Sequence, residues 1–151
     1  MELRTILYVE DNHLDVELTI EAFKENNIAN PIIVAIDGVD ALECLNNEGP
    51  YKGRKPGNPS IILLDLKMPR MDGLEFLSIV KKDTKFKRIP VIMLTSSREE
   101  KDLVKGYDLG VNAYVVKPVD FLSLIDIVKQ IGTFWAIINE LPSFRGQEHE
   151  Q

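Results

Sequence analysis

Five short apolar runs constrain the fold of this chain more than any other feature of its sequence. Each run has four or five residues and is continuous rather than alternating with polar positions. The runs occupy residues 6–9, 32–36, 61–64, 91–94 and 113–116. Continuous runs of mostly β-branched residues are typical of strands that are buried on both faces of a parallel sheet.

Segments with helical periodicity separate these runs. Leu14, Leu18 and Ala22 recur at every fourth position, and a similar apolar stripe crosses residues 74–80. Strands that alternate with helices indicate right-handed βαβ units. We therefore expect an α/β fold built on a doubly wound (βα)5 sheet.

The composition and length exclude several classes of function. There are 18 Lys and Arg against 24 Asp and Glu, a net charge of −6, which argues against a nucleic-acid partner because phosphate binding needs clustered basic residues. No apolar run approaches the roughly 18 residues of a membrane span, so we expect a cytoplasmic protein with no membrane partner. The single cysteine, Cys44, excludes a disulfide framework. We expect one domain over residues 1–141 and a polar tail over 142–151.

Polar residues follow four of the five expected strands where ligands bind in such a sheet, outside the carboxyl ends. Glu10 and Asp11 follow the first run, Asp65 the third, Thr95 the fourth and Lys117 the fifth. Three carboxylates at one rim attract a cation, and an all-oxygen ligand set suits Mg²⁺ or Mn²⁺. Each residue alone could be a helix cap or a solvated side chain, but only a shared site explains their common placement.

The candidate residues stand within longer motifs. These are VEDN at 9–12, ILLDLKMPRMDG at 62–73, MLTSS at 93–97 and YVVKP at 114–118. In order and spacing, the motifs resemble the receiver domain of two-component response regulators, over about residues 3–139. The resemblance implies a flavodoxin-like sandwich with the strand order 2-1-3-4-5.

The resemblance also implies a role for each residue of the site. Asp65 corresponds to the phosphoacceptor, which takes a phosphoryl group from the phosphohistidine of a sensor histidine kinase. Glu10, Asp11 and Asp65 correspond to the magnesium ligands, together with the backbone carbonyl of Lys67. Lys117 corresponds to the lysine that pairs with the phosphoryl oxygens.

A conformational switch is a further implication of the resemblance. Thr95 and Tyr114 match the switch pair, in which the hydroxyl moves to the phosphoryl group and the aromatic ring turns inward. Lys117-Pro118 matches a position at which the family has a cis peptide bond. The long loop at 46–60 and the extended last helix are similar to the stand-alone regulators of cyanobacterial and bacterial phytochromes, so a phytochrome is the expected kinase.

The expected last helix carries two apolar stripes. One stripe should pack on the sheet, and it comprises Phe121, Leu124, Ile125, Val128, Ile131, Trp135 and Ile138. The second lies on roughly the opposite side and comprises Ile127, Phe134, Ile137 and Leu141. Because a second apolar stripe needs a cover, we expect a homodimer through this helix.

Two alternatives share part of this residue set. A phosphohydrolase of the haloacid-dehalogenase type also uses Asp, Mg²⁺, a hydroxyl and Lys, but it has a second Asp two residues after the nucleophile, where this chain has Lys67. A pseudo-receiver that is not phosphorylated normally lacks one of the key acids or the lysine, and all are present here. The favoured interpretation is a signalling switch that catalyses only its own phosphorylation and dephosphorylation.

Overall fold

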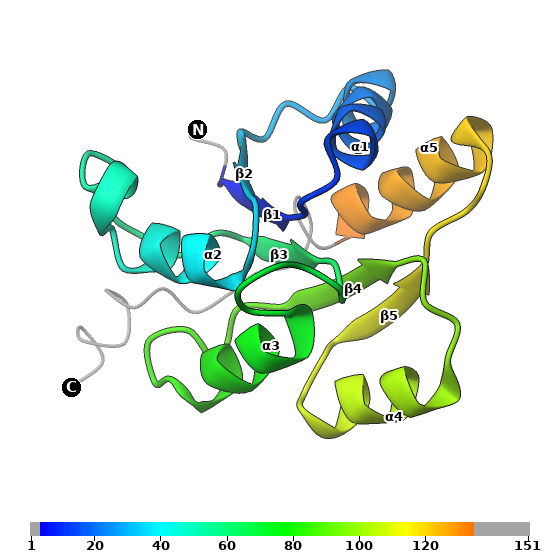
Figure 1. Ribbon diagram of the computed structural model, residues 1–151. Coiled ribbons are helices and arrows are strands. Elements are labelled where there is room, and N and C mark those ends of the chain that lie inside the picture. The colour runs from blue at the N-terminus through cyan, green and yellow to red at the C-terminus, as the bar shows by residue number, and fades with distance from the viewer. Residues whose placement is uncertain (1–3, 135–151) are drawn as a thin grey trace.

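The computed structural model describes residues 4–134, which form a five-stranded parallel sheet between two layers of helices (Figure 1). The strands are β1 (Ile6–Val9), β2 (Ile32–Ala35), β3 (Ile61–Leu64), β4 (Val91–Thr95) and β5 (Ala113–Val116). The helices are α1 (His13–Glu25), α2 (Gly38–Leu45), α3 (Gly73–Lys82), α4 (Glu100–Asp108) and α5 (Phe121–Ile131), with a short 3₁₀ helix, η1 (Gly49–Tyr51). The strand order β2-β1-β3-β4-β5 confirms the predicted fold.

Polar side chains cap most of the helices at the rim that carries the candidate site. Asn12, Asp37, Asp72 and Asp120 each accept a hydrogen bond from a backbone N–H in the first turn of the helix that follows. Such caps satisfy donors that have no partner within the helix. The caps therefore fix where the loops before α1, α2, α3 and α5 end, whereas α4 has no side-chain cap.

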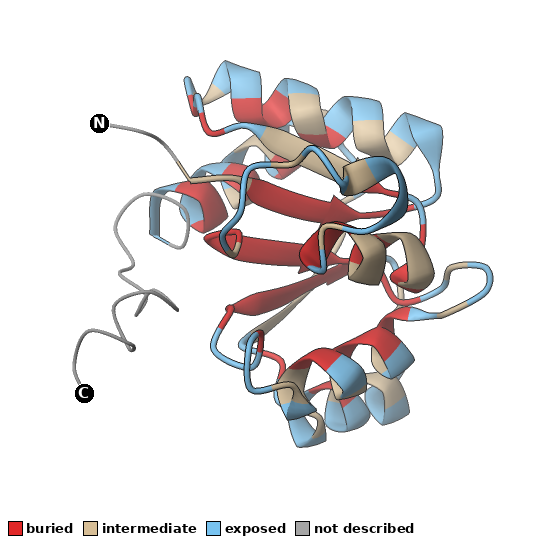
Figure 2. Ribbon diagram, turned by 90° about the vertical axis from the view of Figure 1, so that its left-hand side faces the viewer, coloured by how far each residue is buried: buried red, intermediate tan, exposed pale blue. Residues whose placement is uncertain are grey.

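Two apolar cores fill the space on either side of the sheet. Side chains of α1 and α5 pack on one face, and those of α2 and α3 pack on the other. The central strands β1, β3 and β4 are wholly buried, as Figure 2 shows. The edge strands β2 and β5 are mostly half-buried, so the expectation of burial on both faces is wrong for them. Each of them has a neighbouring strand on one side only.

The apolar stripe expected on α1 is only partly buried. Leu14 and Leu18 are exposed, whereas Thr19, Ala22 and Phe23 are buried. Because each residue advances 100° around a helix, Ala22 lies at the margin of the buried face and the two leucines lie beyond it. The periodicity predicted the helix correctly but not its orientation.

The first apolar stripe of α5 packs on the sheet as predicted, with Leu124, Val128 and Ile131 buried. Trp135 and Ile138 lie outside the described residues. No helix among residues 4–134 is long and apolar enough to cross a membrane.

The loop at 46–60 is mostly exposed, and Arg54 holds it in shape. The Arg54 guanidinium donates to the Cys44 carbonyl at 3.0 Å, to the Gly57 carbonyl at 3.1 Å and to the Asn47 side chain at 2.8 Å. This basic residue therefore has a structural role within the loop.

Candidate functional site

An acidic cluster lies at the carboxyl ends of β1 and β3, which are neighbours in the sheet. Val9 and Leu64 are register partners, so the next residues, Glu10 and Asp65, lie side by side. Together with Asp11, they offer one carboxylate oxygen each, and these oxygens all lie within 4.8 Å of one another. Glu10 and Asp65 are buried, and Asp11 is exposed. The structure thus brings together the three predicted carboxylates.

The cluster suits a small, hard cation. The three donors are all oxygens, and Mg²⁺ typically takes one or two protein carboxylates, with waters and phosphate oxygens completing its shell. A divalent charge between three carboxylates would also relieve their mutual repulsion. Asp65, Asp11 and Lys67 line one open cleft, so a ligand from solvent can reach the cluster. The Lys67 backbone carbonyl as a metal ligand stays a prediction.

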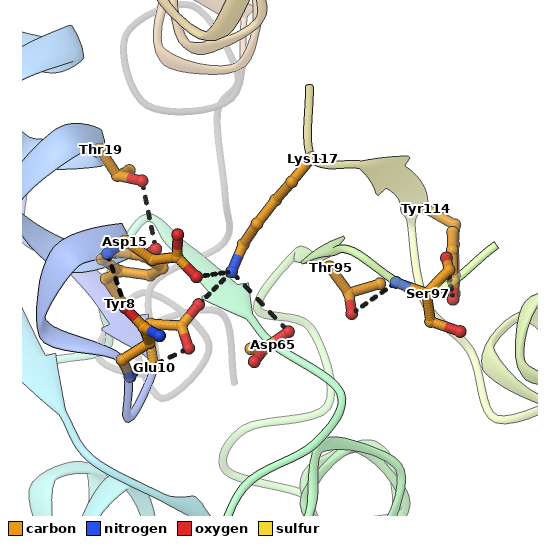
Figure 3. A network of polar contacts seen from close by, with 10 residues as sticks. Tyr8, Glu10, Asp15, Thr19, Asp65, Thr95, Ser97, Tyr114 and Lys117 are labelled. Atoms are coloured by element: carbon orange, nitrogen blue, oxygen red, sulfur yellow. Dashed lines mark hydrogen bonds and ion pairs between the residues drawn. The ribbon is translucent and has the colours of Figure 1, made fainter. Parts of the chain in front are cut away.

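Lys117 reaches into the cluster from the end of β5. Its Nζ contacts the carboxylate of Glu10, lies 3.0 Å from Oδ2 of Asp15 and lies 4.0 Å from Oδ1 of Asp65 (Figure 3). Only 12% of the Lys117 side chain is exposed, which excludes an ordinary solvated lysine. The ammonium group is therefore shared among three carboxylates.

Asp15 is a member of the site that sequence reasoning missed. It lies in the first turn of α1, where an acidic residue is usually explained by the helix dipole. Asp15 follows Asp11 by four residues, but α1 begins between them at His13, so no helical spacing in the sequence linked the two acids.

Burial and charge shift the pKa values of the central ion pair. Burial raises the pKa of Glu10 to about 7, and the neighbouring Asp65 adds to this, whereas the bond from Lys117 opposes it. Burial lowers the pKa of Lys117, but the bond to Glu10 and the charge of Asp65 outweigh it, so this pKa lies above its ordinary value. Both pKa values are therefore raised, which favours the charged form of Lys117 and the protonated form of Glu10.

The peptide bond that follows Lys117 is trans, so the implied cis bond before Pro118 is wrong. Every peptide bond within residues 4–134 has the trans form. Trans is the more stable isomer of an X–Pro bond by about 0.5–1 kcal/mol, and Lys117 reaches the carboxylates from it.

The two expected switch residues both contact Ser97. Thr95 is buried, and its hydroxyl accepts a hydrogen bond from the Ser97 backbone N–H at 3.3 Å. The Tyr114 hydroxyl donates to the Ser97 carbonyl at 3.2 Å (Figure 3). The Ser97 hydroxyl in turn donates to Asp102 in α4 at 2.7 Å. Ser97 therefore connects Thr95, Tyr114 and α4, and Thr95 lines a cleft together with Asp65.

Comparison with known proteins agrees with this geometry. The family model of the response regulator receiver domain matches residues 6–129. The chain belongs to this family. Receiver domains of this family generally serve signalling rather than metabolism.

Several similar proteins are response regulators, and the names of two of them include a phytochrome. Response regulator Rcp1 of Synechocystis is 37% identical over 140 residues, which cover 93% of this chain and 94% of Rcp1. The phosphorylated cyanobacterial phytochrome response regulator RcpA has a TM-score of 0.85 and 38% identity, covering 93% of this chain and 99% of RcpA. The bacteriophytochrome response regulator AtBRR is 53% identical, with a TM-score of 0.76, and covers 93% of this chain and 100% of its own.

One of these receivers has been solved with a metal ion. The Mn²⁺-bound form of Rcp1 has a TM-score of 0.82 and 38% identity, and the match covers 92% of this chain and 99% of Rcp1. A divalent cation therefore binds to a protein that is similar to this chain along nearly its whole length.

Proposed function

We propose that this protein accepts a phosphoryl group on Asp65 from a sensor histidine kinase and thereby changes the surface that it offers to partners. The observation that carries the proposal is the environment of Asp65, which lies between two further carboxylates and the ammonium of Lys117. A carboxylate in that position can act as an oxygen nucleophile, and an incoming phosphoryl group would meet the positive charge of Lys117.

The chemistry follows from the charges of the site. An oxygen of the Asp65 carboxylate attacks the phosphorus of a phosphohistidine, the P–N bond breaks, and the imidazole of the kinase leaves. Phosphoryl transfer depends mainly on positioning and charge neutralisation. Glu10, Asp11 and Asp65, with the Lys67 carbonyl, would hold Mg²⁺ or Mn²⁺, which supplies part of that neutralisation. Lys117 would exchange carboxylate partners for phosphoryl oxygens.

The contacts of Ser97 support a path from the phosphoryl group to the surface. A new phosphoryl group offers strong acceptor oxygens near the Thr95 hydroxyl, which now accepts a hydrogen bond from the N–H of Ser97. If Thr95 turns to donate to the phosphoryl group, the Ser97 segment loses one of its anchors. Tyr114, which is bonded to the carbonyl of Ser97, would then be free to turn inward, and the surface of α4 and β5 would change.

The names of the similar proteins support a phytochrome as the kinase partner. The phytochrome response regulator RcpA and the bacteriophytochrome response regulator AtBRR share 38% and 53% of their residues with this chain. Such a relay would operate in the cytoplasm. Co-expression with candidate phytochrome kinases, followed by light-dependent transfer of labelled phosphate, would test this assignment.

We also propose that the protein forms a homodimer through its last helix. Of the second stripe, Ile127 is half-buried and packs against the same core as the first stripe, so its expected place on the opposite side is wrong. Phe134 is 51% exposed, and it is the described residue that supports the proposal. Ile137 and Leu141 lie outside the described residues. Light scattering at high concentration, with and without phosphorylation, should give the mass of two chains, and a monomer under both conditions would contradict the proposal.

A phosphate-affinity gel tests the central proposal. After incubation with acetyl phosphate and Mg²⁺, wild-type protein should run as a shifted band that disappears when EDTA is added beforehand. Asp65→Asn should give no shifted band, whereas Asp126→Asn, which changes an exposed acid of α5, should behave as wild type. If wild type gives no shift with acetyl phosphate or with a panel of histidine kinases, the pseudo-receiver interpretation replaces this one.

A further inference from the structure

An ion pair outside the acidic cluster joins the loop after β3 to the start of α2. The Arg70 guanidinium donates from Nε to Oδ2 of Asp37 at 2.6 Å and from Nη2 to Oδ1 at 3.0 Å. Only 1% of the Asp37 side chain is exposed, against 54% of that of Arg70. Such two-pronged bonds between arginine and carboxylate are the strong and geometrically specific kind. Burial alone would raise the pKa of Asp37, but the bonds from Arg70 and from the backbone of α2 lower it below its ordinary value.

The backbone of Arg70 has a conformation that an arginine rarely adopts. Its φ is 59°, in the left-handed region, and the Met71 N–H donates to the Pro69 carbonyl at 2.6 Å across it. A hydrogen bond that spans a single residue with positive φ is the pattern of the γ-turn that is rare and strained. A strained turn persists only where surrounding contacts hold it.

Two more contacts hold the same loop against α2. The Gly38 N–H donates to the Met71 carbonyl at 3.1 Å. The Met71 side chain packs against the bare α-carbon of Gly38, where a Cβ would lie only 2.6 Å from the Met71 Cγ. The loop between β3 and α3 is therefore fastened to α2 by an ion pair, a backbone hydrogen bond and a close packing contact.

This loop is also the one that carries the reactive residue. It begins at Asp65 and includes Lys67, and it ends at Gly73, whose N–H donates to the Leu66 carbonyl at 2.7 Å. A Cβ on Gly73 would lie 2.1 Å from the Asp65 carbonyl oxygen, so the two ends of the loop are packed tightly together. A shift of Arg70 would therefore be transmitted through a short, closed loop.

We propose that Arg70 and Asp37 are positioning residues, forming a latch that holds this loop in the conformation in which Asp65 and the Lys67 carbonyl bind a divalent cation. The predicted effect of the latch on cation binding rests on the proposed metal site. The latch itself rests on the ion pair and on the strained turn. Neither residue would touch the cation or the phosphoryl group.

Variants of the two residues separate the latch from the fold. Arg70→Gly removes the guanidinium and leaves a residue that tolerates positive φ, so the turn can form without being held. Asp37→Asn keeps an N-cap for α2 but removes the charge. The matched control is Asn47→Gly, because Asn47 also has a positive φ, of 53°, and also loses a bond from an arginine, Arg54.

The first measurement is the affinity of the unphosphorylated protein for Mn²⁺, with water-proton relaxation as the readout. Changes to residues that orient metal ligands typically weaken metal binding by about 10–100-fold. Because the latch acts on the ligands only through the loop, we expect Arg70→Gly and Asp37→Asn each to weaken Mn²⁺ binding by about tenfold. The double variant should bind Mn²⁺ as well as the weaker-binding single variant does, because the two substitutions break the same ion pair. Asn47→Gly should bind as wild type does.

The second measurement is amide hydrogen exchange over residues 66–73, which reports on the loop directly. Exchange should be faster in both latch variants and unchanged in Asn47→Gly. If wild type binds no Mn²⁺, the proposed metal site fails, while exchange still tests whether the latch holds the loop. Wild-type Mn²⁺ affinity in both latch variants would overturn the positioning role, even if their loops exchange faster.

Discussion

Replacing Asp65 by Asn should make the metal-free protein more stable. The carboxylate of Asp65 is buried beside Glu10 and near Asp11, with one oxygen of each within 4.8 Å of the others. Active sites commonly trade stability for function, because groups that the reaction needs repel one another before the substrate arrives. The amide keeps the shape of the side chain and removes its charge.

The magnitude follows from the three charges around Asp65. Two like charges, on Glu10 and Asp11, repel it, and one opposite charge, on Lys117 at 4.0 Å, attracts it. At about this separation, two unit charges interact by roughly 1 kcal/mol in water and by about 4 kcal/mol at an effective dielectric constant near 20. One repulsion remains after the attraction offsets the other. We therefore expect the free energy of unfolding to rise by about 1–3 kcal/mol.

Urea unfolding followed by circular dichroism at pH 8, in EDTA, measures this difference. Asp126→Asn is the control, and we expect it to change the free energy of unfolding by less than about 0.5 kcal/mol because Asp126 is exposed. Addition of Mg²⁺ should narrow or reverse the difference in free energy of unfolding between Asp65→Asn and wild type, because wild type then gains stability from Mg²⁺ binding. An Asp65→Asn protein that is no more stable than wild type in EDTA would refute the account of a repulsive cluster.

Four further predictions concern the residues around Asp65. In EDTA, the contribution of Glu10 to the free energy of unfolding should fall as the pH rises from 4.5 through about 7, because a raised folded-state pKa stabilises the folded protein only while Glu10 is protonated. Urea midpoints measured across this pH range would show the fall, and Glu10→Gln should remove this pH dependence. Mg²⁺ affinity in titrations should rise over the same range, because the cation competes with a proton for Glu10, and an affinity independent of pH would contradict this. Lys117→Met should lower the free energy of unfolding by about 3 kcal/mol in urea melts, because it leaves Glu10 buried without its ion partner, and an unchanged midpoint would count against the pair. Asp15→Asn should lower the free energy of unfolding by less than about 1 kcal/mol, because the Asp15 side chain is 38% exposed. The same change should speed phosphorylation by acetyl phosphate severalfold, because Lys117 loses one of its carboxylate partners, and slower phosphorylation would contradict this.

The sequence predicted most of the sheet because its signal is local. Four or five consecutive apolar residues define each strand, and the observed strands differ only in ending at Ala35 and extending to Thr95. The predicted carboxylates and Lys117 are also found together, because a parallel sheet places every carboxyl end at one rim.

The features that the sequence did not predict depend on the three-dimensional arrangement. Leu14 and Leu18 continue the helical period of α1, but which side of the helix meets the sheet is decided by packing against α5. The Arg70–Asp37 pair joins residues that are far apart in sequence, and nothing in its local motif marks Arg70 as a residue with positive φ. Only the tertiary structure reveals such contacts.

The most direct test of the central claim is to locate the phosphoryl group chemically. An acyl phosphate is reduced by borohydride, which converts a phosphorylated aspartate to homoserine. After phosphorylation with Mg²⁺ present, peptide mass spectrometry should find homoserine at position 65 and nowhere else. Homoserine at position 11, or none after phosphorylation by an active histidine kinase, would contradict the assignment of Asp65 as the phosphoacceptor.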